Sequence, residues 1–202
     1  SLHDALPICQ GAPLLFFWGS KGSGRSHLLH ATCAEVNACG EAAAYIPLDQ
    51  HVSFEPDVLE QMEQLPLVCL DNIDAIAGYA AWEESLFDFF NRWKEHNHGS
   101  LIVTAATAPR KIGLCLPDLA SRLDWGLSYQ LHELDDEGKL SALQLRAELR
   151  GLKLPVDVGR FLLHRLSRDM RTLLSTLDEL DSASLDAKRK LTIPFVKETM
   201  GL

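Results

Sequence analysis

The sequence predicts an α/β fold followed by a small all-helical domain. Three observations support this prediction. Short apolar runs alternate with helical patterns as far as about residue 134, a glycine-rich loop joins the first run to the first helix, and the strand pattern then stops. Apolar runs that alternate with helices indicate βαβ units, and therefore a parallel sheet flanked by helices. We expect the α/β domain to span 11–134 and the helical domain to span 135–202.

Five apolar runs are expected to form the strands of the sheet. Most of them are continuous rather than alternating, which is typical of parallel strands that are buried on both faces. The expected strands cover residues 14–18, 42–48, 67–70, 101–104 and 127–131.

Helical patterns fill the intervals between these runs and continue to the end of the chain. The helix at 82–95 carries an apolar stripe, which we interpret as core rather than as a cofactor site. The stripe consists of Leu86, Phe89, Phe90 and Trp93. In the second domain, an Asp-Asp pair at 135–136 can cap the next helix, and Gly151 ends it. The expected helices cover residues 25–37, 56–64, 82–95, 117–123, 136–150, 156–167 and 169–185, with a last one from 194.

The composition is that of a globular chain with an acid excess. The 202 residues are 47% hydrophobic and 23% charged, which excludes a disordered chain. Nineteen basic and 28 acidic side chains give a formal charge of -9, so we expect DNA to be contacted only indirectly and expect no attraction to a membrane. No apolar stretch reaches about 18 residues, so no transmembrane helix is expected.

Cysteine usage and the start of the chain bear on its location. The five cysteines include no C-x-x-C pair, which favours reduced thiols in a cytoplasmic protein. Residues 1–10 have neither the charged start nor the long apolar core of a signal peptide. They also lack an initiator methionine and a clear periodicity, so we treat 1–10 as a suspect segment, either a fragment end or a foreign scar.

A phosphate-binding loop is expected between the first strand and the first helix. Residues 19–26 fit the pattern G-x-x-x-x-G-K-[ST], with Arg25 in place of the lysine. Glycines let backbone N–H groups converge on phosphate oxygens, and the helix N-terminus adds partial positive charge. The residues expected to bind the phosphates of ADP or ATP are Gly19, Gly22, Ser23, Gly24, Arg25, Ser26 and His27. The alternative is a glycine-rich turn without a ligand.

Arg25 and the third strand both affect the expected chemistry. Arginine is a wide planar fork and not a compact point charge, so we expect a bound diphosphate but poor γ-phosphoryl chemistry. Asp71 ends a buried strand at the Walker B position, where it and the Ser26 hydroxyl could hold Mg²⁺ indirectly. The alternative for Asp71 is a helix cap at the strand end. Asn72 follows where hydrolytic ATPases commonly have a glutamate base, and Thr104 ends the fourth strand, where it could sense a γ-phosphate.

Four motifs in a fixed order carry a resemblance to a known family. They are residues 19–26, the run LDNIDAIAG at 70–78, the run PDLASRLDWG at 117–126 and the run RDMRTL at 168–173. Together they resemble the AAA+ module of the bacterial initiator DnaA, over residues 11–202. The ending KLTIPFVKE at 190–198 is similar to the regulatory inactivators within this DnaA-homologous family.

The resemblance implies an AAA+ P-loop NTPase-like core with a helical lid, and a negative regulator of chromosomal replication initiation. Bound to nucleotide, preferably ADP, and to the DNA-loaded DNA polymerase III sliding clamp, such a regulator stimulates hydrolysis of the ATP held by DnaA. By resemblance Arg122 is the arginine finger that acts in trans, and Arg171 is the sensor II arginine that contacts the chain's own nucleotide. A homodimer or oligomer with weak or absent ATPase activity of its own is expected.

Two departures from the family pattern are visible. Only about 20 residues separate Ile46 from Leu67, where the initiator carries an extra helical pair that handles single-stranded DNA. The family's clamp-binding peptide is not seen in residues 1–10. Two alternatives stay open: an independent AAA+ ATPase of the helicase-loader or initiator type, and a fragment of a true initiator.

Overall fold

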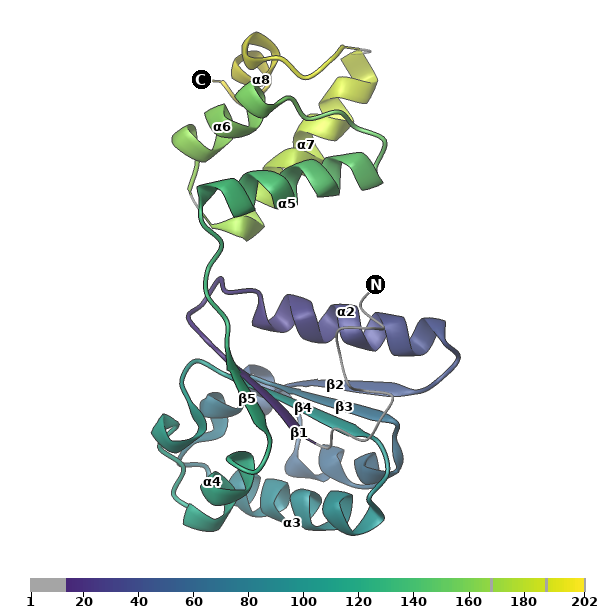
Figure 1. Ribbon diagram of the computed structural model, residues 1–202, viewed down its shortest axis with the longest axis vertical. Coiled ribbons are helices and arrows are strands. Elements are labelled where there is room, and N and C mark those ends of the chain that lie inside the picture. The colour runs from purple at the N-terminus through teal and green to yellow at the C-terminus, as the bar shows by residue number, and fades with distance from the viewer. Residues whose placement is uncertain (1–13, 168, 188, 202) are drawn as a thin grey trace. The chain divides into compact units, whose positions relative to one another are not determined.

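The structure is a computed structural model that describes residues 14–167, 169–187 and 189–201. The suspect segment 1–10 lies outside the described residues. The chain divides into two compact units, the first ending at Glu133 and the second beginning at Leu134 (Figure 1). Each unit has its own hydrophobic core, and we describe each by itself.

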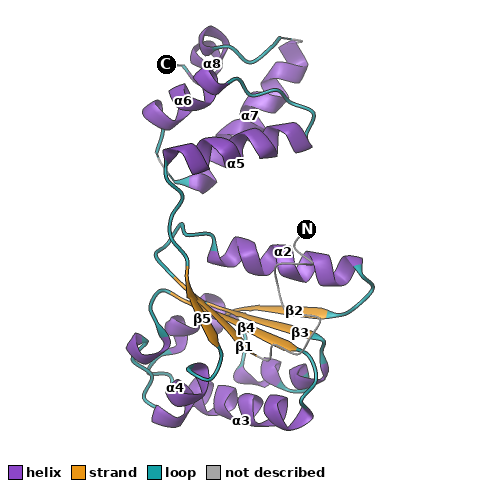
Figure 2. Cartoon of the chain, in the orientation of Figure 1, coloured by secondary structure: helices purple, strands orange, loops and turns teal. Residues whose placement is uncertain are grey.

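Unit 1 is built on a parallel sheet of five strands in the order β2-β3-β4-β1-β5 (Figure 2). This confirms the parallel sheet that the alternating pattern predicted. The strand that precedes the glycine-rich loop, β1, lies between β4 and β5, so the loop follows an interior strand of the sheet. The strands are β1 (Leu14–Trp18), β2 (Ala43–Pro47), β3 (Leu67–Asp71), β4 (Ser100–Ala105) and β5 (Leu127–Gln130).

Helices cover both faces of this sheet. Helix α2 (Arg25–Ala38) packs on one face, where Leu29 and Cys33 meet Phe17 and Cys69. Helices α3 (Ala80–His96) and α4 (Pro117–Leu123) cover the other face. Strand residues alternate between the two faces, so each apolar run supplies side chains to both layers, as buried parallel strands do.

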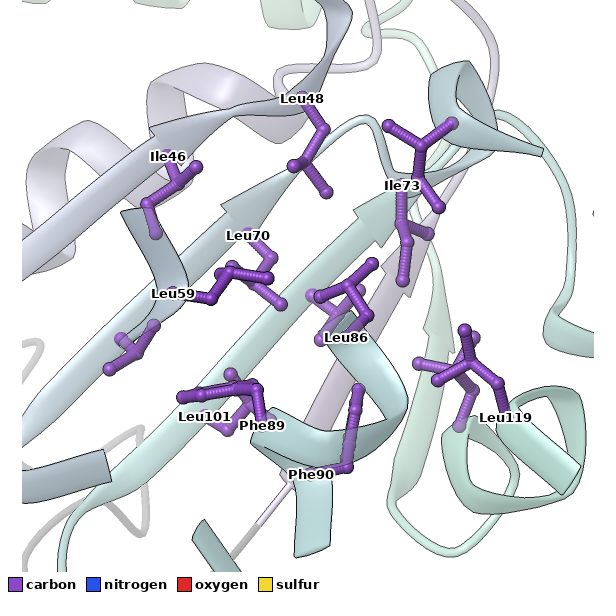
Figure 3. Close-up of a cluster of buried hydrophobic side chains, with 14 of the residues drawn as sticks. Ile46, Leu48, Leu59, Leu70, Ile73, Leu86, Phe89, Phe90, Leu101 and Leu119 are labelled. Atoms are coloured by element: carbon purple, nitrogen blue, oxygen red, sulfur yellow. The ribbon is translucent and has the colours of Figure 1, made fainter. Parts of the chain in front are cut away.

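The aromatic stripe of α3 forms much of the larger core. Leu86, Phe89 and Phe90 are at most 3% exposed and point at the sheet (Figure 3). They pack against residues of β3 and β4, including Leu70 and Leu101. The interpretation of this stripe as core is therefore confirmed.

One predicted helix of unit 1 is wrong. Residues 56–64 form two short 3₁₀ turns, η3 (Pro56–Leu59) and η4 (Met62–Gln64), instead of one α-helix. Glu60 between them is extended and Gln61 is left-handed, with φ 63°, so helical hydrogen bonding cannot continue through this point. With η2 (Leu48–Ser53), these turns are the helical elements of the connection from β2 to β3.

Unit 2 is helical, as predicted. The Asp135 side chain caps α5 by accepting a hydrogen bond of 2.7 Å from the Gly138 N–H, and Gly151 follows the helix with φ 74°. A core of leucines, Val196 and Phe195 joins the helices. The helices are α5 (Asp136–Leu149), α6 (Val156–Arg165), α7 (Met170–Ala187) and α8 (Ile193–Met200). Among the residues described, no helix is both long and apolar enough to cross a bilayer.

Candidate nucleotide-binding site

The loop between β1 and α2 has the backbone conformation of a phosphate cradle. Gly22 and Gly24 have φ values of 96° and 91°, in a region that side-chain-bearing residues rarely adopt. Gly24 precedes α2 directly, and no side chain caps that end of the helix. The first-turn N–H groups of α2 and the positive end of its dipole are therefore available to an anion.

Neighbouring strands hold this loop in place. The Gly19 N–H donates to the Ala105 carbonyl at the end of β4, at 3.2 Å. A Cβ atom on Gly19 would collide with the carbonyl oxygen of Leu131, just after β5. The Ser20 hydroxyl donates to Glu133 at 2.8 Å. The first glycine of the pattern is thus required by close packing between two strand ends.

Two buried polar atoms at the loop fit a bound phosphate. Ser23 Oγ and Arg25 Nη1 are buried and have no hydrogen-bond partner among the described residues. A buried polar group without a partner is costly, and native proteins usually satisfy it with protein, water or a ligand. The phosphate oxygens of a nucleotide are acceptors for both a hydroxyl and a guanidinium. This supports the nucleotide loop over a turn without a ligand.

Asp71 at the end of β3 is buried, with 1% of its surface exposed. Thr104 donates its hydroxyl proton to Asp71 Oδ1, and Tyr45 donates to Oδ2 at 2.7 Å. The side chain caps no helix, because the residue at the N-terminus of η5 (Ile73–Ile76) is Asn72 and has no side-chain cap. The helix-cap alternative for Asp71 is therefore wrong.

Thr104 does not reach toward a γ-phosphate. It is fully buried, donates to Asp71 and accepts a hydrogen bond of 2.9 Å from the Asn72 N–H. Both functions of its hydroxyl are used within the protein. The expectation that Thr104 could sense a γ-phosphate is therefore wrong, because the hydroxyl orders the end of β3 instead.

Tyr45 is the member of the site that the sequence pattern missed. It lies on edge strand β2, two residues before Pro47, which is paired in register with Asp71. Burial, its hydrogen bond to Asp71 and the charge of that carboxylate raise the pKa of Tyr45, and a hydrogen bond with the Ser26 side chain lowers it. The ring of His30 lies 4.0 Å from the Tyr45 ring. The sequence signal that could have indicated Tyr45 was a polar aromatic residue near the end of β2, the strand that precedes the Walker B strand β3.

Arg122 lies apart from the loop, on the sheet face that α3 and α4 cover. Its guanidinium hydrogen-bonds the Asn91 side chain and the Phe87 carbonyl, and its Cζ lies 3.8 Å from the centre of the Phe87 ring. Trp125, 57% exposed, lies beside it, and the Lys94 ammonium sits 3.9 Å from the centre of the Trp125 ring. We call Phe87, Asn91, Lys94, Arg122 and Trp125 the Arg122 cluster.

The remaining predicted residues lie on helix starts. His27 is exposed in the first turn of α2, beside the partly buried Ser26. Arg171 is exposed at the start of α7 in unit 2. The expected contact of Arg171 with the phosphates stays a prediction.

Two family models match the chain, one on each unit. The bacterial DnaA ATPase domain matches residues 7–130, and the lid domain of Hda matches residues 136–200. The first of these covers more than half of the chain. The boundary between the two matches falls close to the division between the two compact units.

Solved structures of DnaA and of a RuvB branch migration motor share the fold. Domain III of DnaA from Thermotoga maritima superposes with a TM-score of 0.78 at 19% identity, covering 98% of this chain and 89% of that one. AMPPCP-bound DnaA from Aquifex aeolicus gives 0.67 at 21% identity, covering 85% of this chain and 56% of that one. The Thermotoga maritima RuvB branch migration motor gives 0.69 at 17% identity, covering 96% and 64%.

At these low identities the solved structures are evidence for the fold alone. The family models are more specific, because the loop of residues 19–26 and the Asp71 strand lie inside the first match and α5 to α8 lie inside the second. The chain therefore belongs to the bacterial DnaA ATPase domain family of AAA+ proteins, and carries the lid domain of Hda.

Proposed function

We propose that this chain is a negative regulator of chromosomal replication initiation that stimulates hydrolysis of the ATP bound to DnaA. The pairing of a DnaA ATPase domain with an Hda lid supports this. The observation that carries the proposal is the contrast between the two functional surfaces. In the chain's own site, Asp71 and Thr104 are buried and hydrogen-bonded to other protein groups. In the Arg122 cluster, by contrast, Trp125 is 57% exposed.

The chain's own nucleotide is ADP in preference to ATP. The loop offers backbone amides, Ser23 and Arg25 to a diphosphate. The Thr104 hydroxyl is already hydrogen-bonded to Asp71 and to the Asn72 N–H, so it does not contact a γ-phosphate. Asn72 cannot act as a base, because an amide does not accept a proton at neutral pH. Ser26 and Asp71 occupy the positions that the P-loop and Walker B patterns assign to Mg²⁺. We expect weak or absent ATPase activity from the chain alone.

Arg122 acts in trans on the ATP of DnaA. An arginine supplied across an interface neutralises the charge that develops on the transferred phosphoryl group, and is worth about 10³–10⁵ in rate. Asn91 and the Phe87 ring hold the guanidinium in a defined position, which lowers the entropy lost when it engages the phosphates. The assembly also needs the sliding clamp on DNA, and at least two AAA+ subunits.

The connection from β2 to β3 supports a regulator over a DNA-melting initiator. By resemblance, the initiator carries an extra helical pair there that handles single-stranded DNA. In this chain residues 48–66 form 3₁₀ turns and no α-helix. The acidic net charge of -9 points the same way, toward protein partners.

The test is a reconstituted hydrolysis assay with the chain, DNA-loaded clamp and DnaA carrying labelled ATP. We expect the wild-type chain to accelerate formation of labelled ADP, and Arg122→Ala to lose the acceleration. Arg110→Ala is the matched control, since Arg110 is an exposed arginine that pairs with Asp124 and lies outside the Arg122 cluster. The proposal fails if Arg122→Ala stimulates as well as wild type.

An independent AAA+ ATPase is the second candidate. The observation that favours it is the retained Walker B carboxylate, Asp71, together with a loop whose glycines keep the phosphate-binding backbone conformation. This candidate predicts ATP turnover by the purified chain without DnaA, abolished by Asp71→Ala. Turnover in the absence of every partner would favour it over the regulator.

A further inference from the structure

Tyr45 lies between the two groups that would position a nucleotide-bound Mg²⁺. In P-loop proteins the Ser or Thr of the loop ligates Mg²⁺ and the Walker B aspartate holds it. Mg²⁺ requires near-octahedral oxygen ligands and keeps several waters, so the space between these groups must admit a hydrated ion. Here the phenol hydroxyl donates to Asp71 Oδ2 at 2.7 Å, and the Ser26 side chain is near enough to lower the pKa of Tyr45.

Asp71 as arranged does not fit a hydrated Mg²⁺. One carboxylate oxygen accepts from Tyr45 and the other accepts from Thr104. The residue is 1% exposed, so its carboxylate faces protein hydroxyl groups rather than solvent. A hydrated cation would have to displace a charge-assisted hydrogen bond, which is stronger than a bond between neutral groups.

Both ends of this hydrogen-bonded chain are fixed by the fold. Tyr45 pairs in register with Cys69 on β3, two residues before Asp71, and its ring packs against His30 of α2 at 4.0 Å. Thr104 is fully buried on β4 and is held by the Asn72 N–H. The phenol is therefore part of the folded framework of the site and does not depend on an exposed, freely rotating side chain.

We propose that the Tyr45 hydroxyl replaces the Mg²⁺ shell as the link between Ser26 and Asp71, so that this chain binds its nucleotide without a divalent cation. The inference rests on the proposed nucleotide binding and deepens it. Phosphate charge is then balanced by Arg25, the first residue of α2, and by the N-terminus of that helix, which directly follows the loop.

The test compares affinities for fluorescently labelled ADP in excess Mg²⁺ and in EDTA. Wild type is expected to bind with the same affinity in the two buffers, within about twofold. Tyr45→Phe keeps the ring packing and frees one oxygen of Asp71, so Mg²⁺ is expected to raise its affinity about tenfold. Tyr79→Phe is the matched control, because Tyr79 is 51% exposed at the start of α3 and is expected to behave as wild type.

A second variant locates the acquired ion. In the Tyr45→Phe background, Ser26→Ala is expected to abolish the Mg²⁺ dependence, and in the wild-type background it is expected to create none. Mn²⁺ serves as a spectroscopic probe: its electron paramagnetic resonance signal should report protein-bound metal with ADP and Tyr45→Phe, and only the free Mn²⁺–ADP complex with wild type.

The outcomes separate this inference from the proposed function. Wild-type affinity that falls about tenfold in EDTA overturns the inference while nucleotide binding stands. An identical Mg²⁺ response in wild type and Tyr45→Phe also overturns it. Failure of wild type to bind labelled ADP in either buffer overturns both the inference and the nucleotide-dependent regulator.

Discussion

At the scale of single residues, Arg25 is the substitution that most changes the expected chemistry. Its guanidinium carries a buried Nη1 without a partner among the described residues, and Ser23 Oγ in the same loop is likewise buried without one. Neither observation could come from the sequence, because each depends on how the loop folds over the start of α2. A phosphate that binds here is held by a fork of donors rather than by the point charge of a lysine.

Arg25→Ala is expected to weaken ADP binding by about 10–100-fold, the value of one hydrogen bond to a charged group. Titration with fluorescently labelled ADP measures this. Lys21→Ala removes the same charge from an exposed position in the same loop and should change the affinity much less. Equal losses in the two variants would mean that only the net charge of the loop matters.

At the scale of elements, Glu83 joins three segments of unit 1. The side chain is 1% exposed and accepts three backbone hydrogen bonds, at 2.8 Å from Gly78, 3.0 Å from Cys115 and 2.7 Å from Leu116. Leu116 is the N-cap residue that directly precedes α4, the helix that carries Arg122. A carboxylate in α3 thereby sets the position of the helix that presents the arginine.

Glu83→Gln is expected to destabilise unit 1 by about 1–3 kcal/mol, because an amide NH₂ would face an N–H where the carboxylate accepted one. Urea unfolding measures the loss. Glu84→Gln, on the exposed side of the same helix, is the control and should leave the midpoint unchanged. A Glu83→Gln midpoint equal to that of wild type would show that water replaces these bonds.

The failed helix at 56–64 also belongs to this scale. Apolar spacing and a proline near the first turn predicted one helix, and Pro56 does open η3. The left-handed Gln61 then interrupts the segment. Its residues are used as separate contacts: Leu59 is fully buried in the larger core, and Glu63 pairs with Arg92 of α3 at 3.3 Å. Tertiary contacts with α3 therefore outweigh the local helical preference.

At the scale of the whole molecule, the chain has separate cores in its two units. The core between the sheet and α3 is made of residues of unit 1 alone, and the core of α5 to α8 is made of residues of unit 2 alone. No residue belongs to both cores among those described. Core substitutions should therefore act on one unit at a time.

Leu177→Ala and Leu86→Ala form a matched pair for this expectation. Both leucines are fully buried, one in each core, and each substitution should cost about 2–5 kcal/mol. Hydrogen exchange read by mass spectrometry should show protection lost in α5 to α8 for Leu177→Ala and in α3 and the sheet for Leu86→Ala. Loss of protection throughout the chain in either variant would contradict separate cores.

The sequence by itself determined the order of strands and helices, the glycine loop, the capped start of α5 and the apolar stripe of α3. These features rest on local patterns: periodicity, glycine spacing and a capping aspartate within a few residues of the N–H that it accepts. Family membership followed from motifs of the same local kind, which the two family models then matched.

Only the tertiary structure decided what those motif residues touch. Tyr45 meets Asp71 across 26 positions of sequence, Thr104 meets Asp71 across 33, and Asn91 holds Arg122 across 31. Such pairs form because parallel strand ends converge at one edge of the sheet and because α3 and α4 pack on one face. No local pattern encodes that convergence. The hydrogen bonds that bury Asp71 and those that fix Arg122 were therefore visible only in the folded chain.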